Sequence, residues 1–119
     1  MGYRTVEVAV GYPVSARAIE DALQRYAPDA PREHEGRKAP LEMLANSCLR
    51  AMGVKALVNK IYPPDDEEYR ETPYFVAVRR RAYKPYEMPG ASLLEESTAS
   101  REVKKAFDIE GGLRMYMLA

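Results

Sequence analysis

The sequence contains a single cysteine, Cys48, and a single histidine, His34, in 119 residues. One cysteine cannot form an internal disulfide, and this pair cannot supply the ligands of a common structural zinc site. The acidic run at residues 65–68 lacks the alternating ligands and central glycine of a calcium loop. A glycine-rich phosphate loop is also missing. We therefore expect no metal site and no cofactor in this protein.

The chain also lacks net charge, since 18 acidic residues balance 18 basic ones. A neutral protein has no overall attraction to nucleic acid or to an anionic membrane surface. No apolar run approaches the ~18 residues of a transmembrane helix, and the first residues lack the apolar core of a signal peptide. We expect a cytoplasmic protein that does not associate with membranes.

Hydrophobic residues make up 46% of the chain and charged residues 30%, which is ordinary for a globular domain. A chain of this length can bury one core without covalent cross-links. No internal repeat or low-complexity tract divides the sequence. We therefore expect residues 1–119 to form a single domain.

Hydrophobic periodicity predicts four strands and three helices. The strands are expected at residues 5–10, 54–62, 73–83 and 113–118. The helices are expected at residues 15–26 behind an N-cap at Ser15, at residues 40–52 before Gly53, and at residues 101–109. Ser92 and Ser100 offer two alternative starts for the last helix. An acidic loop at residues 63–68 joins the second and third strands.

The order of these elements is strand, two helices, two strands, helix, strand. With the paired helices counted as one crossover, this is the βαββαβ order of the ferredoxin-like fold. We expect an α+β domain in which a four-stranded antiparallel sheet carries helices on one face, with an additional helix in the first crossover. The first and third strands should be central because they are the most β-branched, whereas Lys55, Lys60 and Arg114 fall on the other two, as is common for edges.

Alternation along the strands assigns apolar, aromatic and basic side chains to the sheet face that the helices leave uncovered. We call this surface the open face. The binding residues that we expect on it are Leu57, Ile61, Phe75, Arg79, Arg81, Arg114 and Tyr116. The same alternation directs Arg80 away from this face. Exposed apolar patches usually mark an interaction site, so the open face is the predicted contact surface.

Three hypotheses compete for the function. The first is protein–protein contact through the open face, with self-association as its simplest form. The main alternative is a small-ligand binding protein or an enzyme with a pocket between sheet and helices, where His34, Tyr12 and Arg79 would supply polar groups. The second alternative is nucleic-acid binding, with bases stacking on Phe75 and Tyr116. The arginines are also compatible with a simply solvated strand end.

No group of residues indicates a particular reaction. Nucleophilic catalysis requires a base within reach of a cysteine or serine, but Cys48 lies on the apolar stripe of the second predicted helix and should behave as a small buried hydrophobe. His34 stands between Glu33 and Glu35 in a polar loop, where a histidine is usually exposed. We therefore expect a binding or oligomerisation module rather than an enzyme, without catalytic residues.

Overall fold

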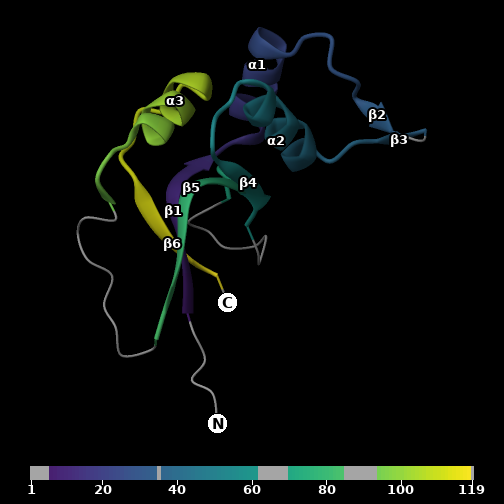
Figure 1. Cartoon of the computed structure of the whole chain (residues 1–119). Helices are drawn as coiled ribbons and strands as arrows, with labels where there is room; N and C mark the ends of the chain where they lie inside the picture. The colour runs from purple at the N-terminus through teal and green to yellow at the C-terminus, as the bar shows by residue number, and fades with distance from the viewer. Residues whose placement is uncertain (1–5, 35, 62–69, 85–93, 119) are drawn as a thin grey trace.

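The computed structural model describes residues 6–34, 36–61, 70–84 and 94–118. In these ranges the chain forms a mixed α/β structure with a four-stranded antiparallel sheet, three helices and a small hairpin (Figure 1). The acidic loop expected at residues 63–68 and the helix start expected at Ser92 lie outside the described residues. No helix in the described ranges combines the length and apolarity needed to cross a membrane.

The main sheet contains β1 (Val6–Val14), β4 (Leu57–Lys60), β5 (Tyr74–Tyr83) and β6 (Arg114–Leu118). Its strand order is β4-β5-β1-β6, and every neighbouring pair is antiparallel. The prediction that the first and third expected strands are central is confirmed, because β1 and β5 occupy the middle of the sheet. Strands β4 and β6, which contain Lys60 and Arg114, form the edges.

Strand β1 is longer than predicted, because Gly11, Tyr12 and Pro13 continue it rather than end it. Strand β6 pairs with β1 only as far as Gly11, so residues 12–14 pair with β5 alone. A proline lacks the N–H that a second neighbour would need, and it is tolerated where a strand has a free edge. The end of β1 around Pro13 therefore has one free edge, and a cleft lies along it.

Helix α1 (Ala16–Tyr26) begins where the sequence predicts, at the N-cap Ser15. The hydroxyl of Ser15 accepts a hydrogen bond of 3.0 Å from the backbone N–H of Ala18. Helix α2 (Leu41–Ala51) also matches its prediction and is followed by Gly53, whose φ of 74° is the left-handed conformation that glycine adopts readily.

Helix α3 (Thr98–Ala106) begins earlier than predicted. Its N-cap is Ser97, and the backbone N–H of Ser97 donates to the Ser100 hydroxyl at 2.7 Å while the Ser100 N–H donates back to the Ser97 hydroxyl at 3.2 Å. Ser100 is therefore the third helical residue of a capping box and not the cap itself. Neither of the two starts predicted from the sequence, Ser92 and Ser100, is the observed N-cap; the reciprocal bonding with Ser100 places the cap at Ser97.

The loop between α1 and α2 contains a hairpin that the periodicity did not predict. It consists of β2 (Glu33–His34) and β3 (Arg37–Lys38), which pair antiparallel. Two residues per strand are too few to produce an alternating pattern. The hairpin forms its own two-stranded sheet, separate from the main sheet.

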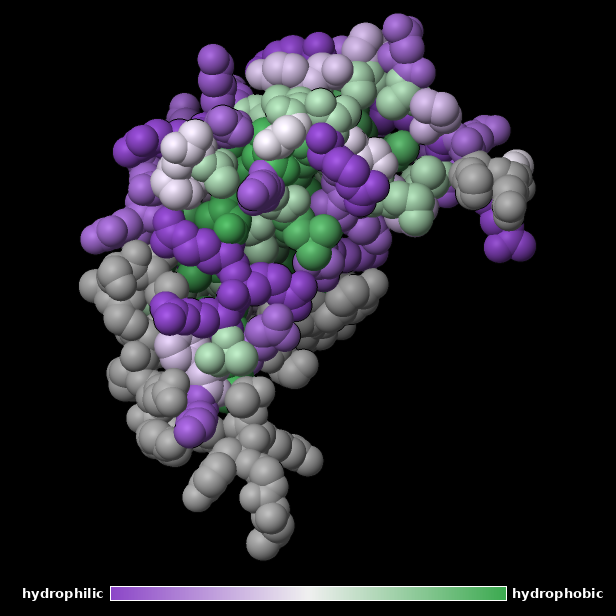
Figure 2. Space-filling view, in the orientation of Figure 1, coloured by the Kyte–Doolittle hydropathy of each residue, from purple (hydrophilic) through white to green (hydrophobic). Residues whose placement is uncertain are grey.

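The core lies on both faces of the main sheet. The larger cluster joins residues of α1, α2 and α3 to inward residues of β1, β4 and β5: Tyr12, Val14, Ile19, Ala22, Leu23, Ala45, Cys48, Leu49, Val54, Val58, Val76, Val103, Ala106 and Phe107. The smaller cluster, on the opposite face, contains Ala9, Ile61, Phe75 and Ala77, with Tyr116 packed against it. Figure 2 shows hydrophobic residues gathered in the middle of the visible surface, bordered by hydrophilic ones.

Cys48 belongs to the larger cluster and is buried, as its place on the helix predicts. Burial raises the pKa of the Cys48 thiol, because the thiolate would lose its hydration. The thiol is therefore held in its protonated form at neutral pH. A protonated, buried thiol is a poor nucleophile, which agrees with a packing role for this cysteine.

Helix α2 is tied to the edge strand β4 by one side chain. The amide of Asn46 donates through Nδ2 to the carbonyl of Val58 at 2.9 Å, and its Oδ1 accepts from the Val58 N–H at 2.6 Å. The side chain thus occupies both backbone groups of Val58, as a neighbouring strand would. An occupied edge is less able to pair with another chain.

Candidate functional site

The open face retains four of its predicted apolar and aromatic members. Strand pairing places Leu57 beside Ala77, and Ile61, Phe75 and Tyr116 meet in the smaller core cluster. The rings of Phe75 and Tyr116 are 5.5 Å apart between centroids. The alternation of side chains therefore identified the composition of this face correctly.

The exposure expected for the open face is wrong at its centre. Phe75 is 3% exposed and Ile61 2% exposed in a single chain, whereas Leu57 keeps 40% of its surface accessible. Alternation predicts which face a side chain shares with its neighbours, but it does not say whether the same chain covers that face. Phe75 therefore presents no ring for stacking on a base, and the nucleic-acid hypothesis loses the contact on which it depends.

The faces predicted for three arginines are also wrong. Between Val10 and Gly11 the pairing of β1 with β5 jumps from Arg79 to Ala77, which leaves Val78 as an extra residue in a β-bulge. The bulge reverses the alternation of the strand beyond it. Arg79 and Arg81 consequently pair with the helix-side residues Val10 and Val8.

Arg80 takes the place on the open face that its two neighbours were expected to fill. It pairs with Ala9, and its guanidinium forms a 3.0 Å ion pair with the carboxylate of Glu7. Both side chains are more than a third exposed, so this pair contributes little to stability. Arg79 instead reaches toward α3, where its guanidinium donates to the backbone carbonyl of Glu95.

Arg114 remains on the open face but does not join the cluster around Phe75. It pairs with Gly11 at the start of β6, and its side chain lines a cleft at the end of the sheet. The predicted site residues therefore divide into three groups. Leu57, Ile61, Phe75 and Tyr116 lie together; Arg79 and Arg81 lie on the other face; and Arg114 belongs to the cleft.

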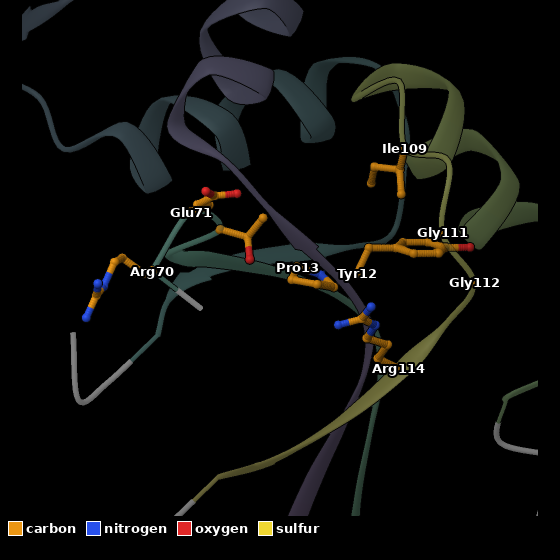
Figure 3. Close-up of a pocket in the computed structure, with 9 residues that line it drawn as sticks. Tyr12, Pro13, Arg70, Glu71, Ile109, Gly111, Gly112 and Arg114 are labelled. Carbon is orange, nitrogen blue, oxygen red and sulfur yellow. The ribbon is translucent and has the colours of Figure 1, made fainter. Parts of the chain in front are cut away.

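The cleft follows the free edge of β1, and we call it the Tyr12 cleft. Its volume is about 650 Å³, which is within the range of ~300–1,000 Å³ typical of small-ligand sites. Three chain segments form it: the end of β1, the segment that leads into β5, and the turn from α3 into β6 (Figure 3). Its lining residues are Tyr12, Pro13, Arg70, Glu71, Thr72, Ile109, Gly111, Gly112 and Arg114.

Tyr12 is the most unusual residue of this cleft. Its side chain is fully buried, and its hydroxyl is the one buried side-chain polar atom without a hydrogen-bond partner in the described part of the chain. Figure 3 shows the ring in the wall of the cleft, with its hydroxyl directed toward the segment of Gly111 and Gly112. A buried hydroxyl without a partner costs about 1–3 kcal/mol, so this group is destabilising in the free protein.

Charges of both signs surround Tyr12. Figure 3 shows Arg114 extending from β6 toward Pro13, whereas the guanidinium of Arg70 points away from the other lining residues. Glu71 enters from the segment before β5 and is exposed. The cleft can therefore contact a ligand with a cation and a carboxylate, while the phenolic hydroxyl of Tyr12 lies buried in its wall.

Gly111 and Gly112 leave one wall of the cleft without side chains. A Cβ built at either position meets no atom within 4 Å. A larger residue at either position would therefore extend into open space without a clash. In the sequence, the pair indicated only the end of the last helix.

Of the three polar residues expected for a ligand pocket, one lies at the Tyr12 cleft. Arg79 bonds to the backbone before α3, and His34 belongs to β2, which Figure 1 places on the other side of α1 and α2 from α3. Residues 70–72 were missed because they precede a strand and follow no recognisable pattern. In the described ranges, no cluster of three His, Cys, Asp or Glu residues is placed to hold a metal ion.

The geometry of the Tyr12 cleft thus defines a concave polar site at the end of a sheet. Comparison with known proteins adds no assignment to it. No protein-family model, no curated protein and no solved structure matches this chain.

Proposed function

We propose that this protein is a small-molecule binding module whose ligand occupies the Tyr12 cleft. The observation that carries the proposal is the buried, unpartnered hydroxyl of Tyr12. Buried polar groups in folded proteins nearly always have a partner, and an exception calls for an explanation. The hydroxyl has no accessible surface in the free protein, so a ligand reaches it only if the segment of Gly111 and Gly112 moves aside. A ligand that enters there and accepts a hydrogen bond from this hydroxyl would supply the missing partner.

The form of the cleft supports this proposal. Backbone of three separate segments surrounds it, and Tyr12 and Pro13 are fixed by their pairing with Val76 and Phe75 of β5. Sites held by strands maintain their geometry better than sites held by loops alone. The Tyr12 ring is therefore in place before a ligand arrives, which lowers the entropic cost of binding.

Substitution of Tyr12 by phenylalanine tests the proposal. In the ligand-free protein, Tyr12→Phe should increase the free energy of unfolding by about 1 kcal/mol, because it removes a buried hydroxyl that has no partner. The same change should reduce the thermal stabilisation that a ligand gives, because one hydrogen bond accounts for about tenfold in affinity. The measurement is differential scanning fluorimetry of both proteins against small carboxylates, phosphates, amino acids and amides.

Two further variants complete this experiment. Tyr74→Phe removes a hydroxyl from a half-buried tyrosine outside the cleft and should leave every ligand response unchanged. Gly112→Leu adds a bulky side chain at the lining of the cleft and should weaken the response while preserving the fold. The proposal is wrong if no compound stabilises the wild-type protein, or if Tyr12→Phe and Gly112→Leu respond as the wild type does.

Self-association through the open face is a second candidate, favoured by Leu57. This residue is 40% exposed beside a cluster that the chain otherwise buries. We propose a contact of smaller area than the sequence predicted, because Phe75 and Ile61 are buried. It is centred on Leu57 and on the exposed ion pair of Arg80 and Glu7. The two candidates are compatible, because Leu57, Arg80 and Glu7 are not among the residues that line the Tyr12 cleft.

We further propose that the fold is a ferredoxin-like variant and that the protein acts in the cytoplasm. If the hairpin β2–β3 is treated as an insertion in the first crossover, the sheet order β4-β5-β1-β6 supports the βαββαβ assignment. The cytoplasmic proposal is supported by the single thiol, Cys48, which is buried and free.

A further inference from the structure

We infer that the ligand of the Tyr12 cleft is a zwitterion of the α-amino-acid type with an apolar side chain. This inference rests on the ligand-binding function proposed above and specifies its substrate class. It follows from three properties of the lining residues: the signs of their charges, the placement of their hydroxyl groups and the position of their apolar surface.

The charges available to a ligand are one of each sign. Arg114 and Glu71 both line the cleft, and in the described part of the chain neither takes part in an ion pair or a side-chain hydrogen bond. Arg70 is different, because it has an interaction of its own and its guanidinium points away from the cleft in Figure 3. The electrostatic complement of this site is therefore a molecule that carries both a negative and a positive group.

Each charged group suits one end of an amino acid. A guanidinium such as that of Arg114 binds a carboxylate through two parallel N–H···O bonds. If the segment of Gly111 and Gly112 moves to expose it, the Tyr12 hydroxyl can donate a further hydrogen bond to a carboxylate oxygen, which would satisfy the buried group that now lacks a partner. The carboxylate of Glu71 and the neighbouring Thr72 hydroxyl can accept hydrogen bonds from an ammonium group.

A ligand with only one charge would fit less well. A simple anion would leave Glu71 facing a like charge, and a simple cation would do the same at Arg114. Juxtaposed like charges disfavour the wrong ligand and so contribute to specificity. A neutral ligand would leave both charges without a partner. The zwitterion is the class that gives each residue an opposite charge and neither a like one.

The remaining surface of the cleft indicates an apolar side chain. Pro13 and Ile109 are half-buried, and the face of the Tyr12 ring lies between their segments. Gly111 and Gly112 add no side chain to the lining of the cleft. An aliphatic or aromatic side chain could therefore pack against Pro13 and Ile109.

A charge-matched series of compounds tests this inference by isothermal titration calorimetry of the full chain. L-leucine carries both charges, N-acetyl-L-leucine only the negative one, and L-leucinamide only the positive one; L-phenylalanine and its two derivatives form a second series. We expect each zwitterion to bind at least about tenfold more tightly than either of its singly charged derivatives, the size of effect typical for one lost charge pair.

Two variants assign the charges to residues. Arg114→Gln should weaken the zwitterion and the N-acetyl compound about tenfold or more, whereas Glu71→Gln should weaken the zwitterion and leave the N-acetyl compound unchanged or tighter. Arg50→Gln and Glu20→Gln change exposed charges outside the cleft and serve as matched controls. Both controls should bind like the wild type.

The outcomes separate this inference from the proposed function. If N-acetyl-L-leucine binds as well as L-leucine and Glu71→Gln has no effect, the site is an anion site and the zwitterion is overturned while ligand binding stands. If no member of either series binds but another compound gives a Tyr12-dependent stabilisation, the inference again fails alone. If no compound binds in either experiment, both the proposed ligand-binding function and the zwitterion inference are wrong.

Discussion

Gly11 and Tyr12 are neighbours in β1 with opposite effects on stability. Tyr12 carries a buried hydroxyl that destabilises the free protein. Gly11 permits a close approach of two strands, because a Cβ built on it would lie 1.8 Å from the carbonyl oxygen of Val76. The contact is with backbone atoms of a central strand, which cannot move aside as a flexible side chain could. The position therefore excludes every side chain.

We predict that Gly11→Ala destabilises the protein by about 3 kcal/mol, the upper part of the range for overpacked interiors. The measurement is the free energy of unfolding from urea titration. Gly111→Ala is the control, since its Cβ meets open space and should cost nothing or add a few tenths of a kcal/mol. Equal stabilities for the two variants would mean that the approach of β5 does not restrict the residue at position 11.

At the scale of the element, the sequence predicted the kinds of elements better than their details. Strand β5 was expected at residues 73–83 and is observed at Tyr74–Tyr83. Its bulge at Val78 could not be predicted, because the residue pattern of this β-branched and basic segment does not change at the position where one residue is unpaired. One unpaired residue was enough to exchange the faces expected for Arg79, Arg80 and Arg81.

The link between α2 and β4 gives a second prediction at this scale. Asn46→Ala removes the partners of both backbone groups of Val58. We expect a loss of about 1–3 kcal/mol in the free energy of unfolding. We also expect more self-association in light scattering, because the vacated edge can pair with another chain.

Gln24→Ala is the control for this prediction. Gln24 is an exposed amide on α1, away from β4 and the open face, and within the described residues its side chain forms no hydrogen bond. Its replacement should change neither stability nor scattering. If Asn46→Ala behaves in the same way, the side-chain amide does not protect the edge.

For the whole molecule, hydrophobicity alone predicted the centre of the sheet but not the site. The β-branched strands β1 and β5 are central because both of their faces are covered by clusters of the core. The Tyr12 cleft could not be predicted, because its walls come from residues 12–13, 70–72 and 109–114, which are distant in sequence. Composition likewise could not reveal that Phe75 and Ile61 are buried within one chain.

Self-association through the open face predicts a specific response to Leu57→Glu. The wild type should have twice the mass of one chain in multi-angle light scattering at high concentration, and Leu57→Glu should have the mass of one chain at unchanged stability. A monomeric wild type, or a variant that keeps the doubled mass, excludes this contact. Phe75→Glu is not a clean probe, since it places a charge at a position that is 3% exposed and would destabilise the monomer itself.

The bonding of Val58 to Asn46 has a consequence for measurements of local opening. The amide proton of Val58 is held by a side chain of α2 and not by a neighbouring strand. Its exchange with deuterium therefore requires α2 to separate from β4, whereas the amides that β5 and β1 hold for each other require the sheet to open. A comparison of these exchange rates in the native protein would give the free energy for detaching one helix separately from that for unfolding the sheet.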